Sequence, residues 1–139
     1  NPRIGIAGLN PHSSDNGLFG WEEEKEIIPA VNALKGMGYH VEGPVPPATL
    51  FAKAKCGQYD GCVAMYHDQG HIPFKVVAFN WDPKTGKMES VQGVNITLGL
   101  PIIRVSVDHG TAFDVAGKGI ASPDAMLLSI DYAARMANN

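Results

Sequence analysis

Residues 59–75 read YDGCVAMYHDQGHIPFK, and this stretch decides how the rest of the chain is interpreted. Its first part is apolar and compact, which predicts a buried strand over 60–66. A polar cluster of His67, Asp68 and Lys75 follows, and α/β proteins bind their ligands at the carboxyl ends of strands. The cluster therefore indicates a metal or an anionic substrate. Two simpler interpretations stay open, in which His67 is a satisfied polar group and Asp68 caps the next helix.

The segments around this stretch alternate between strand-like and helix-like patterns. The sequence predicts strands at 3–9, 39–43, 91–98 and 102–107, and helices at 21–37, 48–55, 72–79 and from Ser122 onward. In the first helix, Ile27, Ile28, Val31 and Leu34 share one face. Turn-forming residues at 80–87 predict an exposed loop or hairpin. The alternation predicts an α/β fold with a mainly parallel sheet.

Composition narrows the class of protein. The chain has 139 residues, 45% of them hydrophobic and 18% charged, which is ordinary for one globular domain. A formal net charge of -3 argues against a nucleic-acid surface. No apolar run approaches ~20 residues, and no secretory signal pattern is present, so we expect a cytoplasmic protein without a membrane partner. Because the sequence opens on Asn1 and goes straight into a strand, we expect a piece of a longer protein.

Three histidines, His12, His67 and His109, fall in loops that follow predicted strands. A catalytic metal site needs about three protein ligands and one open position, and separate loops commonly supply them. Nearby carboxylates would orient such ligands. The candidates for that role are Asp15, Asp68, Asp108 and Asp114.

Three polar residues stand in apolar surroundings: Lys75, Asn95 and Arg104. Arg104 lies inside a strand-like run, where a buried guanidinium needs an anionic partner. That partner is either a structural carboxylate, with Asp68 and Asp108 as candidates, or a bound carboxylate or phosphate. The sequence leaves both alternatives open.

The stretch 108–119 is rich in glycine and reads DHGTAFDVAGKG. Glycines let the backbone approach a ligand closely, although a purely structural loop has the same composition. The first strand is not followed by a GxGxxG pattern, so the usual Rossmann fingerprint is missing.

Taken together, the motifs resemble the 4-hydroxythreonine-4-phosphate dehydrogenase (PdxA) family. The resemblance runs from about residue 4 to residue 134 and is carried by four segments: 10–12 (NPH), 66–70 (YHDQG), 93–101 (GVNITLGLP) and 106–112 (SVDHGTA). It implies an isocitrate/isopropylmalate dehydrogenase-like α/β fold, and that residues 1–139 form the C-terminal part of a two-lobed subunit whose N-terminal lobe is absent.

The resemblance also implies roles for individual residues. His12 and His67 match two of the family's three metal-binding histidines, with the third upstream of Asn1. His109 matches the cofactor loop and not a metal ligand. The remaining roles are catalysis by Lys75 and Asp68, substrate binding by Lys75, Asn95 and Arg104, and NAD binding by His109, Gly110, Thr111, Ala112 and Asp114.

The activity implied is NAD-linked oxidation of a phosphorylated hydroxy acid, with decarboxylation, in a homodimer that binds Zn, Mg or Co. The expected substrate is 4-phosphohydroxy-L-threonine of pyridoxal phosphate biosynthesis. The sequence departs from the family pattern in two places: Ala48 replaces a common Asp, and the loop 76–92 is longer than in the standard enzyme of the family. Residues 71–74, which read HIPF, resemble relatives that act on phosphorylated threonate or erythronate, or on a terephthalate-derived dihydrodiol. A metal-dependent hydrolase and a non-catalytic domain are the rival classes.

Overall fold

The computed structural model describes residues 1–79, 81–84, 86–88 and 93–138. The chain divides into two compact units, Asn1–Phe74 and Lys75–Asn139. Among the described residues, no helix is long and apolar enough to cross a membrane.

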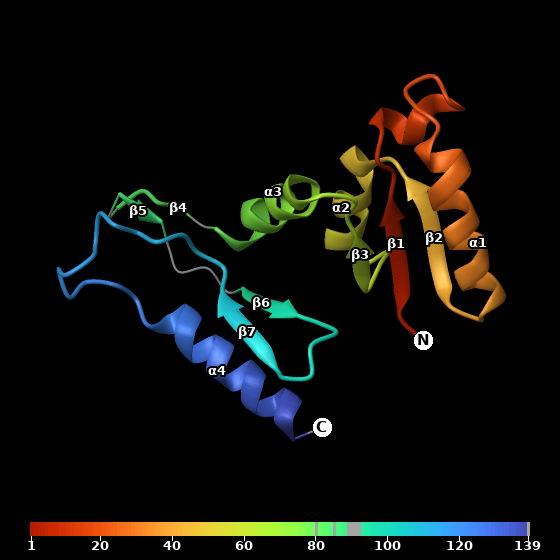
Figure 1. The fold of residues 1–139 in the computed structure, drawn as a ribbon. Coiled ribbons are helices and arrows are strands. Elements are labelled where there is room, and N and C mark those ends of the chain that lie inside the picture. Colours follow the sequence, from red (N-terminus) through yellow and green to blue (C-terminus); the bar gives the residue numbers. More distant parts are fainter. Residues whose placement is uncertain (80, 85, 89–92, 139) are drawn as a thin grey trace. The chain divides into compact units, whose positions relative to one another are not determined.

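The first unit is built on a three-stranded parallel sheet with the order β2-β1-β3 (Figure 1). β1 (Arg3–Ala7) is the central strand, and β2 (His40–Val45) and β3 (Gly61–Val63) flank it. Three of the predicted strands are thereby confirmed, although β3 is shorter than the predicted 60–66. The parallel arrangement follows from the crossover helices that separate the strands in sequence.

Both faces of β1 are buried because successive side chains point to opposite sides of a sheet. Ile6 packs with Ile27 and Val31 on one side. Ala7 packs with Leu50 and Tyr59 on the other. Accordingly, α1 (Ile28–Gly36) and α2 (Pro47–Lys55) lie on opposite sides of the sheet (Figure 1).

The helix predicted at 21–37 differs from expectation in two ways. It begins as a π-helical turn, η2 (Glu23–Ile27), and continues as α1. Ile28 is exposed, whereas the predicted apolar face included it. The wider π turn rotates the residues after it, so the apolar face no longer follows one regular helical period.

α3 (His67–Ala78) begins earlier than the predicted 72–79, with Pro73 inside it. The boundary between the two units falls within this helix. The hairpin predicted at 80–87 is confirmed by β4 (Trp81–Asp82), which pairs antiparallel with β5 (Lys87–Met88). Part of the long 76–92 loop, residues 80, 85 and 89–92, lies outside the described residues.

The second unit holds an antiparallel ribbon of β6 (Val94–Thr97) and β7 (Arg104–Val107), against which α4 (Asp124–Ala137) packs. The expected mainly parallel sheet is therefore confirmed for the first unit, whereas the described strands of the second pair antiparallel. The reason is the short 98–103 connection, which is too brief for a parallel crossover.

Candidate functional site

His12 belongs to a turn, η1 (Pro11–Asp15), that follows the carboxyl end of β1. Its Nδ1 lies 2.9 Å from Oδ2 of Asp15, and the side chain is 70% exposed. A carboxylate that accepts the Nδ1 proton fixes the tautomer in which Nε2 is free to bind a metal. Asp15 is thus placed as the sequence suggested, beside a candidate ligand.

The backbone around His12 is unusual. Positive φ angles run without interruption from His12 to Asn16. A left-handed conformation costs about 1–2 kcal/mol for each residue that is not glycine. Ser14 is buried within this turn, and its hydroxyl donates a hydrogen bond to the carbonyl of Gly20. The hydrogen bond between Ser14 and Gly20, within the same loop, therefore helps to hold the His12 turn in a shape that the local sequence disfavours.

The segment before His12 is anchored by Glu23. Its carboxylate accepts hydrogen bonds from the backbone amide of Asn10 at 2.7 Å and from the Asn10 side chain at 2.8 Å. Burial, which leaves Glu23 only 3% exposed, raises the pKa of Glu23, but hydrogen bonds from Asn10 and from nearby backbone amides outweigh it and hold that pKa below its ordinary value. Nothing in the sequence patterns indicated this anchoring role of Glu23.

His67 is the first residue of α3, where sequence reasoning expected a loop. Its ring stacks on that of His71, with centroids 3.9 Å apart and planes 17° apart. Residues at i and i+4 of a helix are neighbours on one face, which explains the stack. Within the described part of the chain, the ring nitrogens of His67 form no hydrogen bond, so they are available to a metal. Asp68 is exposed in the first turn of α3, where its charge suits the helix dipole.

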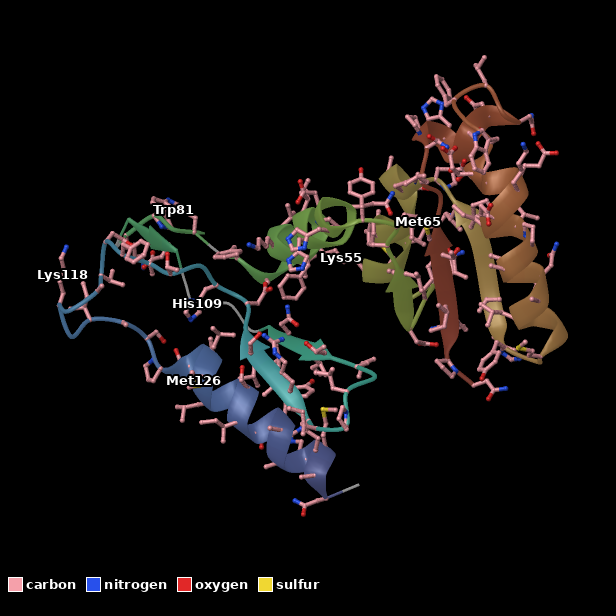
Figure 2. All side chains as sticks on the ribbon, viewed as in Figure 1. Lys55, Met65, Trp81, His109, Lys118 and Met126 are labelled. Atoms are coloured by element: carbon pink, nitrogen blue, oxygen red, sulfur yellow. The ribbon has the colours of Figure 1, made fainter. Side chains whose placement is uncertain are left out.

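Gln69 is a buried residue that sequence reasoning missed. Its Oε1 accepts from the backbone amide of Met65 at 2.7 Å, and its Nε2 donates to the carbonyl of Gly8 at 2.8 Å. Met65, labelled in Figure 2, follows β3 and packs against both core clusters. Gln69 thus joins the turn after β3 to the end of β1. A glutamine within an otherwise helix-compatible run gave no signal of this bridge.

The donor chemistry of His12 and His67 fits a divalent metal, and both follow the carboxyl ends of adjacent parallel strands. Imidazole nitrogen suits Zn and Co better than Mg. Within the described residues, no three His, Cys, Asp or Glu side chains form a potential metal group. A complete site therefore requires a ligand beyond these two, as the family resemblance implies.

The ribbon in the second unit brings two expected substrate ligands onto one face. Asn95 pairs with Ser106, and Thr97 pairs with Arg104. Because directly opposite residues share a face and alternate residues do too, all four point to the same side. Asn95 and Arg104 are exposed there.

Arg104 is not buried, so the expectation that burial forces an anionic partner on it is wrong. Its Nη1 instead donates to Oγ1 of Thr97 at 2.7 Å. Arg104 stands at the start of the strand, where its long side chain reaches water. Thr97 is a second residue that sequence reasoning missed, although its place two residues after Asn95 was a usable signal. Lys75 is exposed on α3.

The expected cofactor residues follow β7 in an exposed segment, with His109 labelled in Figure 2. Nδ1 of His109 lies 2.9 Å from the carbonyl of Gly110. Ala112 has a φ of 48°, and successive turns follow through Lys118. Backbone amides exposed in such turns can bind phosphate oxygens. Thr111 and Asp114 belong to the same exposed segment.

Ala48, which stands where the family commonly has an Asp, is exposed in the first turn of α2.

Known proteins resemble this chain along nearly its whole length. D-threonate 4-phosphate dehydrogenase from Cupriavidus necator is 55% identical over 137 residues, covering 98% of this chain and 38% of that protein. 4-Hydroxythreonine-4-phosphate dehydrogenase from Desulforapulum autotrophicum is 50% identical over 136 residues, covering 98% of this chain and 37% of that protein.

The crystal structure of 4-hydroxythreonine-4-phosphate dehydrogenase from Klebsiella pneumoniae matches with a TM-score of 0.73 and 51% identity. The match covers 95% of this chain and 37% of that one, so this α/β chain corresponds to a C-terminal portion of its relatives. The model of the family described as pyridoxal phosphate biosynthetic protein PdxA matches residues 1–133. The chain therefore belongs to the PdxA family.

Proposed function

We propose that the protein containing this chain catalyses NAD-linked, metal-dependent oxidation and decarboxylation of a 4-phosphorylated hydroxy acid. The observation that carries this proposal is the family match over residues 1–133. The chain spans less than two fifths of the length of the relatives from Cupriavidus necator and Desulforapulum autotrophicum. We propose that the complete enzyme also contains the N-terminal lobe that the family resemblance implies.

Substrate binding is assigned to Asn95 and Arg104, which share the polar face of the β6–β7 ribbon. Arg104 presents a planar fork of donors that matches a carboxylate or phosphate, and Asn95 offers both a donor and an acceptor to orient a hydroxyl. Lys75 adds a point charge for an anionic group. Lys75 and Asp68 are also the proposed proton-transfer residues.

His12 and His67 are the proposed metal ligands, with a further ligand from the N-terminal lobe. A divalent metal, when bound, lowers the pKa of the substrate hydroxyl and stabilises negative charge as carbon dioxide leaves. Because Asp15 lies beside Nδ1 of His12, Nε2 is the nitrogen that we propose binds the metal.

NAD binding is assigned to the segment formed by His109, Gly110, Thr111, Ala112 and Asp114. NAD accepts the hydride. The exposed backbone of this segment and the positive φ of Ala112 suit close contact with a dinucleotide phosphate.

Two substrates compete. The relative named for D-threonate 4-phosphate is 55% identical, and the one named for 4-hydroxythreonine-4-phosphate is 50% identical. The higher identity to the first relative makes D-threonate 4-phosphate the main alternative to 4-phosphohydroxy-L-threonine as the substrate. Both are 4-phosphorylated hydroxy acids, which a pocket containing Arg104 and Lys75 would bind by their charge.

The test is an assay of the full-length enzyme with NAD and each compound, with D-erythronate 4-phosphate and the terephthalate-derived dihydrodiol as further substrates. NADH formation with a 4-phosphorylated acid supports the proposal, and the ratio of kcat/KM values identifies the substrate. Release of phosphate without NAD reduction would instead indicate a metal-dependent hydrolase. Failure to bind NAD and metal would indicate a non-catalytic domain.

The complete protein is proposed to be a cytoplasmic homodimer. Exposed apolar side chains on α4, among them Met126, Leu127 and Ile130, are consistent with a protein contact. Sedimentation as a monomer at micromolar concentration would contradict the dimer.

A further inference from the structure

Gln69 is a buried polar residue that has no part in the proposed reaction. It is 7% exposed, and both ends of its amide are occupied. Met65, its acceptor-side partner, lies four residues away, whereas Gly8, its donor-side partner, lies 61 residues away. One side chain therefore connects two segments that are distant in sequence.

These two segments lead to the candidate metal ligands. Gly8 follows β1 and precedes His12 by four residues, while Gln69 itself lies two residues after His67. β1 and β3 are adjacent and parallel, so their carboxyl ends lie at the same edge of the sheet. The Gln69 amide crosses this edge, close in sequence to both histidines.

Gly8 is a rigid point of attachment. Its amide donates to the carbonyl of Val45 at 3.0 Å. A Cβ added to Gly8 would lie 2.7 Å from Oγ of Ser13 and 3.1 Å from Oε1 of Glu23. Because Gly8 is enclosed on these sides, a hydrogen bond to its carbonyl transmits position and does not merely follow a mobile loop.

We propose that Gln69 is a positioning residue that sets the separation of His12 and His67 for a shared divalent metal. This inference rests on the proposed function, which assigns the two histidines as ligands. Without the amide, the start of α3 loses its attachment to β1, and the imidazole of His67 is no longer held at a fixed distance from the His12 turn.

The test uses the full-length protein and two substitutions that remove different parts of the bridge. Gln69→Met has a similar length and removes both hydrogen bonds. Gln69→Glu keeps an acceptor for the Met65 amide and removes the donor to the Gly8 carbonyl. Gln58→Met is the matched control, because Gln58 is an exposed glutamine in the same unit.

Affinity is measured by titrating metal-free protein with Co²⁺, whose absorption spectrum reports coordination geometry, and melting temperature is measured without metal. We expect Gln69→Met to weaken Co²⁺ binding at least about tenfold and to alter the spectrum, as residues that orient ligands do. Gln69→Glu should weaken binding by a smaller factor, and Gln58→Met should match the wild type.

Wild-type affinity and spectrum in the folded Gln69 variants would overturn the proposal, even with a lower melting temperature. If Gln69→Met does not fold, Gln69→Glu decides by the same criterion.

His12→Ala and His67→Ala separate this inference from the function on which it rests. If both lose Co²⁺ binding while the Gln69 variants keep it, only the positioning role of Gln69 fails. If both bind Co²⁺ like the wild type, the metal site itself fails, and the positioning role fails with it. NAD reduction by the wild-type enzyme is measured separately and tests the dehydrogenase assignment.

Discussion

The carboxylate of Glu23 accepts hydrogen bonds from both the backbone amide and the side-chain amide of Asn10, at 2.7 and 2.8 Å. This pair fastens the first helical turn of η2 to the segment that leads to His12. Glu23 is nearly inaccessible to water, so its charge is stabilised by these donors and not by solvent. The relationship gives a stability prediction that is independent of the proposed activity.

Replacing Glu23 with Gln should lower the free energy of unfolding by about 1.5–3 kcal/mol at pH 7. The NH2 group of the glutamine would then face an N–H group of Asn10, so one hydrogen bond is lost. The lowered pKa of Glu23 gives this effect a pH dependence. The stabilisation is complete above the ordinary glutamate pKa and is lost as the pH falls through the lowered folded value. The free energies of unfolding of the wild type and of Glu23→Gln, measured with urea, should therefore become equal only at acid pH. Glu24→Gln, at an exposed neighbouring position, is the control, and an equal loss there would contradict the anchoring role.

Tyr59 should make stability fall at high pH. The pKa of Tyr59 is raised to about 12, first by burial of the phenol and second by its hydrogen bond with Glu42. In the unfolded chain the phenol loses its proton near pH 10, so the stabilisation is present below that pH and is lost as the pH rises from 10 to about 12. The difference in melting temperature between the wild type and Tyr59→Phe should shrink over this range. The exposed Tyr39 gives the control, Tyr39→Phe. A Tyr59 phenolate forming near pH 10 in a difference titration would contradict the prediction.

Sequence patterns predicted the elements whose formation depends on local preference and continuous apolar burial. β1 was found because an apolar run between turn-forming segments is typical of a buried parallel strand. The last helix was found from Ser122, whose hydroxyl accepts a hydrogen bond from the amide of Asp124 at 3.2 Å. Both signals lie within a few residues of the element they predict.

The missed features depend on partners that are distant in sequence. The bridge made by Gln69 reaches Gly8 across 61 positions, and nothing near Gln69 indicates that its amide is buried. The anchoring role of Glu23 was likewise missed, because its hydrogen-bond donors come from the preceding loop. The early start of α3 was missed because polar residues after an apolar run were assigned to a loop. His12, His67 and the neighbouring Asp15 were found from the sequence, whereas the roles of Gln69 and Glu23 required the fold.

Thr97 should assist substrate binding through Arg104. Its hydroxyl accepts a hydrogen bond from the guanidinium at 2.7 Å, directly across the β6–β7 ribbon. Thr97→Val removes that acceptor and keeps the β-branched shape. We expect the KM for the phosphorylated substrate to rise about threefold to tenfold, from a hydrogen bond of ~1 kcal/mol, with the KM for NAD unchanged. Thr97→Ser retains the hydroxyl and should restore the substrate KM. An unchanged KM in Thr97→Val would mean that Arg104 orients itself without help.

The most direct test of the substrate site is Arg104→Lys in the full-length enzyme. Lysine keeps the positive charge and loses the planar fork that binds an anion with two parallel hydrogen bonds. We expect kcat/KM to fall about 10–100-fold, corresponding to ~1.5–3 kcal/mol for a charged hydrogen bond. NAD affinity and melting temperature should hardly change. Arg104 is exposed, and the substitution costs the folded protein only the surface hydrogen bond between Arg104 and Thr97.

Arg135→Lys is the control for Arg104→Lys, since Arg135 is an exposed arginine of the same unit and pairs with Asp131 at 2.6 Å along α4. It should leave kcat/KM unchanged, because an exposed pair within one helix contributes little even to stability. A different outcome would reassign Arg104. If Arg104→Lys lowers the melting temperature and its folded fraction keeps full activity, Arg104 stabilises the ribbon, and the anion must then be bound by Lys75 or by the N-terminal lobe.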